Sequence, residues 1–378
     1  MAYEQARRLV SWGHEVAVVT SRLMGDPPYQ ICDGIHVHRV RAINPLERKG
    51  VPYPLFAPAL LTRVFRLVRQ ADIVLAHSHT FQASVVASLV SRWANKPFVI
   101  LQHNTYVNYK PPWNIVESLA DLLLGRMTLW SARRVLAISR ETKHYIERLA
   151  CDKPVIVLHN GVDTKRFRPV QDQEKADIRK KFGLPPDKFL VLTVRRLVYR
   201  NGVDTLVQAA AELRENSSFH FLIGGTGPDT ALLERLINNQ GLTNCTLLGF
   251  VEDGLLPEYY SASDVFVLPS RTGEGCGLVV LEAFASGLPV VATSVGGQTD
   301  IVLDQETGFL VAPDSPGEIA AALTRCNLDR DLYLKMSRKA MALAESLDWD
   351  KQTGLLLKHL RETWDLFSRD KSTLDITH

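Results

Sequence analysis

Residues 263–297 form the stretch that most restricts how this chain can fold. The apolar run Asp264–Pro269 leads into the glycine-rich segment Thr272–Gly277, and Leu278–Ala285 is apolar enough to be a buried helix. Pro289–Thr293 is apolar and β-branched again, as expected of a second strand. A strand, a loop, a helix and a strand in this order are typical of a parallel α/β sheet.

The same alternation continues through nearly the whole chain and predicts a doubly wound parallel sheet. Strands are predicted at Glu15–Thr20, Ile35–Arg41, Asp72–His77, Pro97–His103, Arg134–Ser139, Val155–His159, Phe189–Val194, His220–Gly224, Thr246–Phe250 and Thr307–Val311. Further helices are predicted at Glu4–Trp12, Pro58–Gln70, Phe81–Trp93, Asn114–Trp130, Arg140–Leu149, Gly202–Arg214, Asp229–Asn239, Lys351–Ser368 and after Pro316. The segment Asn160–Gln173 between the two halves is predicted to be an interdomain linker.

Length and composition agree with two domains of ordinary size. The 378 residues are 46% hydrophobic and 22% charged, and each half is long enough to bury its own core. We expect an N-terminal domain at residues 1–165, a C-terminal domain at 166–350 and a C-terminal helix at 351–378. The five cysteines show no CxxC spacing, which favours reduced thiols in the cytoplasm. No apolar run reaches the roughly 18–20 residues of a membrane span.

Charge is distributed unevenly along the sequence. Residues 1–165 hold 21 Lys and Arg against 12 Asp and Glu, whereas the whole chain has a net charge of only +3. A basic N-terminal half suggests contact with an anionic membrane surface or a lipid-linked phosphate; ordinary solvated faces are the alternative. Nucleic acid is not expected, because the basic residues are dispersed and not interleaved with aromatic ones.

The glycine-rich segment carries the residues most suited to chemistry. Its backbone N–H groups lead into a helix N-terminus, where an anion such as a diphosphate is stabilised by free donors and the helix dipole. Glu274 and Glu282 lie eight residues apart, one on the loop and one inside the helix. Both are expected at the carboxyl ends of the strands, where open α/β sheets bind ligands.

The string PSRTGEGCGLVVLEAFASGLPVVAT (Pro269–Thr293) closely resembles the donor-site signature of retaining GT-B glycosyltransferases of family 4. That signature is E-x7-E within P-S-x-x-E-G-x-G-L-x-x-x-E-A. The resemblance implies two Rossmann-like doubly wound domains facing across a cleft, with a final helix that crosses back to the first domain. Members of this family open with a strand and a Gly-Gly loop, whereas Met1 stands almost at the start of the first helix here. We therefore expect the first strand of the N-terminal domain to be missing, through a shortened chain or a remodelled sheet.

The resemblance also extends to RRLVYRNG, which follows the strand Phe189–Val194. It is similar to the family motif G-R-L-x-x-x-K-G, whose Arg and Lys neutralise the donor diphosphate. Arg196 matches the Arg, and a planar guanidinium suits phosphate. Asn201 replaces the Lys, which puts stabilisation of the leaving group by this motif in doubt; Arg200 next to it is a candidate for the missing charge.

Further donor-binding residues follow from the resemblance. IGGTGPD resembles the family's glycine turn beside the nucleotide, and LGFV resembles the segment whose backbone pairs with the base. The amides at the start of the helix would hold the diphosphate, and Glu282 would bind the ribose hydroxyls. The donor-binding residues implied besides these are Arg196, Arg200, Asn201, Gly225, Gly227, Phe250, Val251, Gly275, Gly277, Leu278 and Val279.

The expected catalytic residues are Glu274, His103 and Arg196. His103 ends a predicted strand, where the family has a His close to the transferred sugar; a hydrogen-bonded loop histidine is the alternative. His77 and His79 also end a strand, but we expect them to pack or to support other residues and not to bind metal. The aromatic loop Tyr106–Trp113 is a candidate contact for an acceptor or a membrane, or a packed surface loop.

The sequence thus predicts a retaining, metal-independent hexosyltransferase without a cofactor. By the family resemblance it would use a nucleotide-diphosphate sugar, with a lipid, a saccharide or a small molecule as acceptor. It would act in the cytoplasm or at the inner face of the membrane. The alternatives are a non-catalytic or impaired nucleotide-sugar-binding protein, or another GT-B enzyme such as a sugar-nucleotide epimerase.

Overall fold

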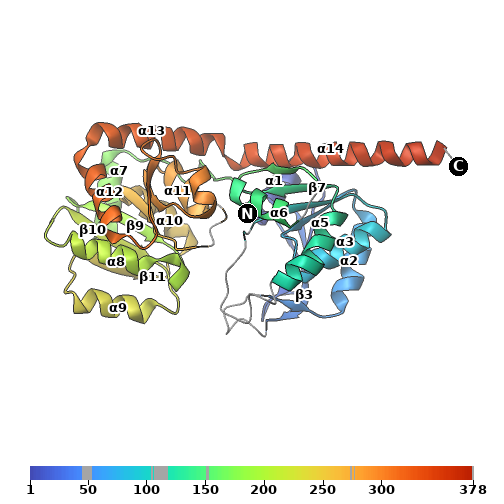
Figure 1. Ribbon diagram of the computed structural model, residues 1–378, viewed down its shortest axis with the longest axis horizontal. Helices are drawn as coiled ribbons and strands as arrows, with labels where there is room; N and C mark the ends of the chain where they lie inside the picture. The colour runs from blue at the N-terminus through green and yellow to red at the C-terminus, as the bar shows by residue number, and fades with distance from the viewer. Residues whose placement is uncertain are drawn as a thin grey trace. The chain divides into compact units, whose positions relative to one another are not determined.

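The computed structural model describes residues 1–44, 53–103, 105, 118–149, 153–272, 275 and 277–376. The chain forms two compact units (Figure 1). Unit 1 comprises Met1–His159 and Trp349–His378, and unit 2 comprises Asn160–Asp348. The divisions lie a few residues before the expected boundaries after residues 165 and 350.

Unit 2 contains one continuous sheet of six parallel strands. These are β9 (Phe189–Val194), β10 (Phe219–Gly224), β11 (Cys245–Gly249), β12 (Val265–Leu268), β13 (Val290–Thr293) and β14 (Gly308–Val311). Their order is β11-β10-β9-β12-β13-β14, with every neighbouring pair parallel. The chain order therefore reverses between β9 and β12, and such a switch point is where doubly wound sheets bind ligands.

Helices cover this sheet, which explains why its strands are apolar on both faces. The helices of unit 2 are α7 (Asp172–Lys181), α8 (Val203–Glu212), α9 (Thr230–Asn239), α10 (Leu256–Ala262), α11 (Leu278–Ala285), α12 (Pro316–Leu328) and α13 (Arg330–Ser346). Val191, Phe221 and Val265 of the sheet share one buried cluster with Leu206 of α8 and Met336 of α13. At about 25 cal/mol per Å² of buried apolar surface, such clusters supply most of the stabilisation of the unit.

Unit 1 differs because its strands form two separate sheets. The first has the order β1-β3-β2, with β4 paired to β3, and the second has the parallel order β5-β6-β7-β8. The strands are β1 (Ala17–Arg22), β2 (Tyr29–Cys32), β3 (Ile35–Ile43), β4 (Leu55–Phe56), β5 (Val74–His77), β6 (Phe98–Gln102), β7 (Arg134–Ala137) and β8 (Val155–Val157). None of the described strands pairs with both β1 and β5. The sequence predicted one sheet that lacks its first strand, whereas the structure has two half-sheets.

Side chains of two helices connect the half-sheets. In the described part of unit 1, α1 (Ala2–Ser11), α2 (Ala59–Gln70), α3 (Gln82–Trp93), α5 (Arg126–Ser131) and α6 (Arg140–Arg148) accompany the strands, and the π-helical turn Asp121–Gly125 precedes α5. Val19 of β1 and Val74 of β5 pack against one cluster formed by Val64 of α2, Val90 of α3 and their neighbours. Among the described residues of unit 1, apolar packing and not strand pairing therefore holds the two sheets together.

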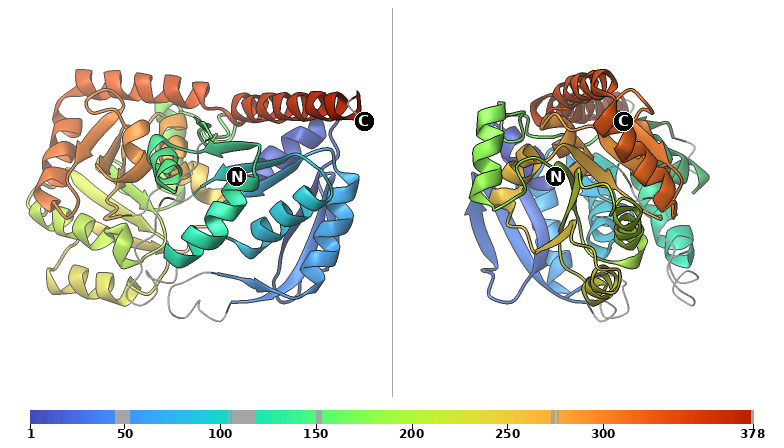
Figure 2. Two further views of the ribbon diagram at one scale, coloured as in Figure 1. Left: turned by 45° about the vertical axis from the view of Figure 1, so that its right-hand side comes forward. Right: turned by 90° about the vertical axis from the view of Figure 1, so that its left-hand side faces the viewer.

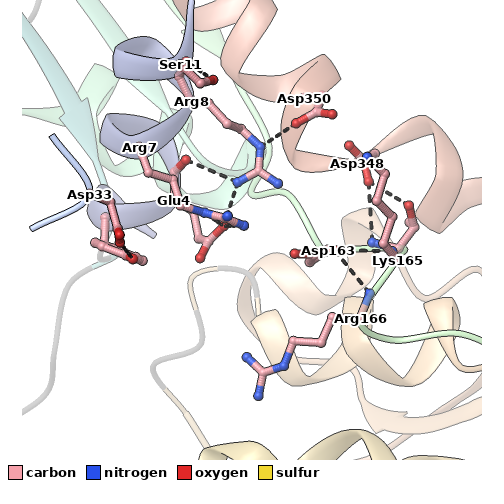
Figure 3. A network of polar contacts seen from close by, with 12 residues as sticks. Glu4, Arg7, Arg8, Ser11, Asp33, Asp163, Lys165, Arg166, Asp348 and Asp350 are labelled. Carbon is pink, nitrogen blue, oxygen red and sulfur yellow. Dashed lines mark hydrogen bonds and ion pairs between the residues drawn. The ribbon is translucent and has the colours of Figure 1, made fainter. Parts of the chain in front are cut away.

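The long last helix, α14 (Trp349–Ile376), belongs to unit 1. Figure 3 shows Arg8 of α1 between two carboxylates, with its Nε 2.5 Å from Asp350 Oδ1 and its Nη1 2.5 Å from Glu4 Oε2. Further along α14, Glu362 pairs with Arg134 at 2.6 Å. These ion pairs attach α14 at two places on unit 1.

The sequence missed four short elements and misjudged one segment. The strands β2 and β4 and the helices α7 and α10 were not expected, and the segment predicted as a linker is in part packed into unit 2. Val162 and Phe167 of that segment are buried, and Val162 forms a bridge with Asp348. None of the helices in the described part of the chain has the length and apolarity that crossing a bilayer requires.

Candidate functional site

The switch point of unit 2 brings together two chain segments, one after β9 and one after β12. Arg195 and Arg196 follow β9 directly, and Pro269 to Arg271 follow β12. A hydrogen bond from the Arg271 amide to the Arg200 carbonyl (2.8 Å) joins the segments, and Arg195 Nη1 donates to Ser270 Oγ (2.8 Å). The segment that carries Arg196 is therefore fixed against the end of β12.

Arg196 is an exposed cation of this edge. Its side chain is exposed to solvent, and no carboxylate pairs with it in the described part of the chain. Two hydrogen bonds fix its backbone carbonyl, which accepts from the Val198 amide (3.1 Å) and from Asn201 Nδ2 (2.6 Å). A guanidinium on a fixed backbone, free of protein partners, is suited to binding an anion.

Asn201 has a different place from the one its motif position suggested. Its side chain is 7% exposed, and its amide nitrogen donates to the Arg196 carbonyl. Gly202 follows with φ +65°, and a Cβ there would lie 1.9 Å from the Pro269 carbonyl oxygen. The Asn-Gly pair thus packs the turn against β12, and we expect Asn201 to position Arg196 rather than to replace the missing lysine. Arg200 remains exposed at the same edge.

The glycine turn after β10 lies against the backbone of Arg195–Leu197. Gly225 has φ +126°, and a Cβ at this position would stand 1.8 Å from the Arg195 carbonyl oxygen. A Cβ at Gly227 would stand 2.1 Å from the Leu197 carbonyl oxygen, and the Leu197 amide donates to Thr226 (3.0 Å). Only glycine permits this approach, so the structure brings Gly225 and Gly227 next to Arg196 as the sequence predicted.

Arg271 is a residue of this edge that sequence reasoning missed. It makes a bidentate pair with Asp204 (2.7 and 2.8 Å) and a further pair with Asp314 (2.5 Å), and its guanidinium lies over the Tyr199 ring at 4.3 Å. These contacts raise its pKa, first through the Asp204 hydrogen bond. Its place directly after a strand of the signature was a usable signal, but its engaged side chain indicates a structural role.

The start of α11 provides the backbone donors expected of the signature. Gly277 caps the helix and Leu278 and Val279 begin it. The first amides of a helix have no intrahelical acceptor, and the helix dipole favours an anion there. Gly275 is described just before this cap, whereas Glu274 lies outside the described residues, as does the aromatic loop Tyr106–Trp113.

Glu282 lies one turn into α11, where it interacts with two residues that the sequence did not predict, Tyr260 and Arg166. The hydroxyl of the buried Tyr260 donates to Glu282 Oε2 (3.0 Å). Burial raises the pKa of the Glu282 carboxyl, while the Tyr260 hydrogen bond and the cation of Arg166 oppose that rise. Arg166 is itself paired with Asp253 at 2.8 Å. Tyr260 belongs to α10 and hydrogen-bonds only one of the two carboxylate oxygens of Glu282 among the described contacts.

Phe250 and Val251 follow the edge strand β11. Phe250 is 75% exposed. Val251 packs closely on Gly224, because a Cβ added at Gly224 would stand 2.9 Å from Val251 Cγ2. The Gly249 carbonyl accepts from the Gly225 amide (2.6 Å). These contacts place the end of β11 beside the glycine turn.

His103 belongs to unit 1 and stands directly after β6. Its Nε2 lies 2.7 Å from Nδ1 of His77, and the two rings are stacked with centroids 4.9 Å apart. Burial lowers the pKa of His103 to about 3 and that of His77 to about 4, so both rings are neutral near pH 7. No described group binds Nδ1 of His103, which leaves that atom for a ligand.

A buried polar chain lies behind this pair. Gln102 Oε1 accepts hydrogen bonds from the amide (3.1 Å) and Nδ1 (2.8 Å) of His79. The other ring nitrogen of His79 is 3.2 Å from Asp121 Oδ1, and Tyr145 donates to Asp121 Oδ2. His77 and His79 therefore lie in two different environments, and His79 supports the end of β6.

Comparison with known proteins matches these features to one family. The profile described as "Glycosyltransferase Family 4" matches residues 1–166, and the profile "Glycosyl transferases group 1" matches residues 174–342. The D-inositol 3-phosphate glycosyltransferase of Acidothermus cellulolyticus is 32% identical over 382 residues, covering 94% of this chain and 83% of that protein.

Solved structures agree on the fold. The sucrose-phosphate synthase of Thermosynechococcus elongatus has a TM-score of 0.77 at 24% identity, covering 97% of this chain and 93% of its own. The Anabaena protein HepE, solved in complex with UDP, has a TM-score of 0.75 at 21% identity, and the match covers 92% of this chain and 100% of HepE. The fold is that of the GT-B glycosyltransferases, with two Rossmann-like domains, and the chain belongs to glycosyltransferase family 4, the glycosyl transferases group 1.

Proposed function

We propose that this glycosyltransferase takes its sugar from a nucleotide-diphosphate sugar bound at the switch-point edge of unit 2. The observation that carries the proposal is the convergence there of Arg196, whose guanidinium pairs with no carboxylate among the described residues, with the start of α11. Both favour a diphosphate, through bidentate guanidinium contacts and free backbone donors. The complex of HepE with UDP supports a nucleotide as the ligand of this fold.

Each remaining donor contact follows from the chemistry of its residue. Glu282, as a carboxylate held by Tyr260, would accept hydrogen bonds from the ribose hydroxyls. The backbone around Phe250 and Val251 would face the base. Arg196 would stabilise the negative charge that develops on the departing diphosphate, and such electrostatic stabilisation is usually the largest single contribution to catalysis.

The sugar would be contacted by Glu274 and by His103. Nδ1 of His103 is the nitrogen without a partner among the described groups, which supports its contact with a sugar hydroxyl. We propose transfer with retention of the anomeric configuration and without a metal or other cofactor. In this reaction the bond between the anomeric carbon and the diphosphate oxygen breaks, the acceptor oxygen forms the new bond, and the acceptor proton passes to the leaving diphosphate.

The acceptor would be a lipid, a saccharide or a small molecule. The Acidothermus relative is named for a phosphorylated polyol, and the basic first half of this chain would suit an anionic acceptor in the same way. A lipid-linked acceptor would require contact with the cytoplasmic face of a membrane.

The test is an assay of the purified chain with a panel of UDP-, GDP- and ADP-sugars and candidate acceptors. Release of free nucleotide only when an acceptor is present, with a product of retained configuration, is the expected result. Tight donor binding without turnover for any acceptor would instead indicate a non-catalytic nucleotide-sugar-binding protein. Absence of any donor binding would overturn the proposal.

A further inference from the structure

Helix α2 of unit 1 is apolar on more of its surface than the core uses. Leu60, Val64 and Val68 are buried against the core. Leu61, on another face of the helix, is 55% exposed. A helix at a protein surface normally has one apolar stripe, directed to the core, so the outer apolar residues need another explanation.

The neighbouring helix α3 extends this apolar surface. Leu89 is 48% exposed and Trp93 is 69% exposed, and the Trp93 ring packs on Phe65 of α2 with centroids 4.8 Å apart. Helices α2 and α3 lie side by side in unit 1 (Figure 2). Between them runs a groove of about 1090 Å³ whose lining includes all four apolar residues together with Arg66 and Arg69.

The charge of this surface has one sign. Helices α2, α3 and α5 contain no Asp or Glu. Arg66, Arg69 and Arg92 are exposed, and in the part of the chain that the structure describes no carboxylate pairs with any of them. The Arg69 guanidinium lies 5.7 Å from the Phe65 ring, and that of Arg92 lies 5.3 Å from the Trp130 ring of α5.

We propose that the α2–α3 face of unit 1, formed by Leu61, Phe65, Arg66, Arg69, Leu89 and Trp93, docks on an anionic lipid membrane. Indole and leucine side chains enter the boundary between headgroups and acyl chains, while arginines beside them bind lipid phosphates. A second copy of this chain fits the face poorly, because it would bring two sets of unpaired arginines together. The inference deepens the membrane contact of the proposed function and rests on it for its purpose, although lipid binding is measurable without any donor.

The test is co-sedimentation of the full chain with vesicles of phosphatidylcholine plus phosphatidylglycerol and with vesicles of phosphatidylcholine alone. The wild type is expected to bind the anionic vesicles and to lose that binding as salt is added. The triple variant Arg66→Glu/Arg69→Glu/Arg92→Glu is expected to lose at least about 100-fold in partitioning, at about fivefold for each arginine. Trp93→Ala, which keeps every charge, is expected to lose about tenfold.

A matched control separates local from overall charge. Lys180→Glu/Arg235→Glu/Arg338→Glu makes the same charge change at exposed positions of unit 2. Because salt screens long-range attraction, this variant is expected to bind anionic vesicles within about twofold of the wild type. Circular dichroism and titration with a nucleotide sugar verify that each variant is folded.

Three outcomes would overturn the docking surface. These are equal binding by the two triple variants, equal binding of the wild type to both kinds of vesicle, and self-association of the wild type that the α2–α3 variants abolish. Donor binding that persists while vesicle binding fails would remove only this surface. Vesicle binding that persists without any donor binding would instead remove the proposed function.

Discussion

Both units present candidate ligand-binding residues at the carboxyl edge of an α/β sheet, but the two sheets are built differently. In unit 2 six strands pair without interruption, and the loops of the edge are joined to each other by backbone hydrogen bonds such as Arg271 to Arg200. In unit 1 two half-sheets are joined through the side chains of α2 and α3. The difference teaches that hydrogen bonds fix the edge of unit 2 directly, whereas the two halves of unit 1 depend on side-chain packing for their connection.

The largest expected effect on stability comes from breaking the buried ion pair between Arg179 and Asp264 in unit 2. Arg179 is 7% exposed; its Nη2 lies 2.7 Å from Asp264 Oδ2, and its Nε donates to the Ala262 carbonyl (2.9 Å). Removing one partner of a buried pair costs about 3–5 kcal/mol, and Asp264 also accepts from the Leu190 amide of β9 (2.7 Å). Arg179→Ala is therefore expected to lower hydrogen-exchange protection throughout β9 and its neighbours, while β6 of unit 1 keeps its protection.

The matched control is Arg235→Ala, since Arg235 is exposed on α9 and, in the part of the chain that the structure describes, bonds only to its own helix. It should leave exchange in both units unchanged. If Arg179→Ala lowered protection equally in β6, the two units would not be independent in stability, and the comparison would fail.

A second, smaller effect concerns the histidine pair of unit 1. Burial lowers the pKa of His77 to about 4 and of His103 to about 3, below the ordinary value of about 6.5. The unfolded chain then binds protons that the folded unit does not, so unit 1 should lose stability as the pH falls from about 6.5 towards these values. Unit 2 contains neither ring and should not share this loss.

Histidine C2-proton NMR measures the pair directly. The resonances of both rings should be constant between about pH 8 and pH 5.5 and should move only at lower pH. Titration of either ring near the ordinary value would contradict the burial of the pair and its neutral hydrogen bond.

The smallest expected effect is a gain in stability at the donor edge of unit 2. Because burial raises the folded pKa of Glu282, the folded unit is favoured at low pH, and this contribution is lost as the pH rises through that pKa. Glu282→Gln removes the charge and keeps an acceptor for Tyr260, so at pH 7 it should stabilise unit 2 by about 0.5–2 kcal/mol. Thermal unfolding of the variant at neutral and acid pH provides the measurement; a variant less stable at pH 7 would show that the carboxylate is well solvated.

The sequence predicted the edge of unit 2 better than that of unit 1, for the same physical reason. Phe189–Val194 and Leu278–Ala285 form as predicted because continuous apolar runs determine buried elements locally. Gly225 was found because a turn needs its backbone freedom.

Tyr260 and Asp121, two of the residues that were missed, have no local signal in the sequence. Tyr260 reaches Glu282 from a helix 22 positions earlier, and Asp121 reaches His79 across 42 positions of sequence; such contacts exist only once the tertiary structure has formed. Nor did the motif indicate the hydrogen bond from the Asn201 side chain to the Arg196 carbonyl. The separation of unit 1 into two half-sheets was likewise not readable from its strands one by one.

The most direct measurement for the proposed donor site is calorimetric titration of a nucleotide-diphosphate sugar into the wild type, Glu282→Ala and Arg196→Ala. Each variant removes a charged hydrogen-bonding partner worth about 1.5–3 kcal/mol, so each should weaken binding by about 10- to 150-fold. Arg235→Ala serves as the exposed control and should bind as the wild type does. Unchanged affinity in both site variants would contradict the assignment of the donor to the edge between β9 and β12.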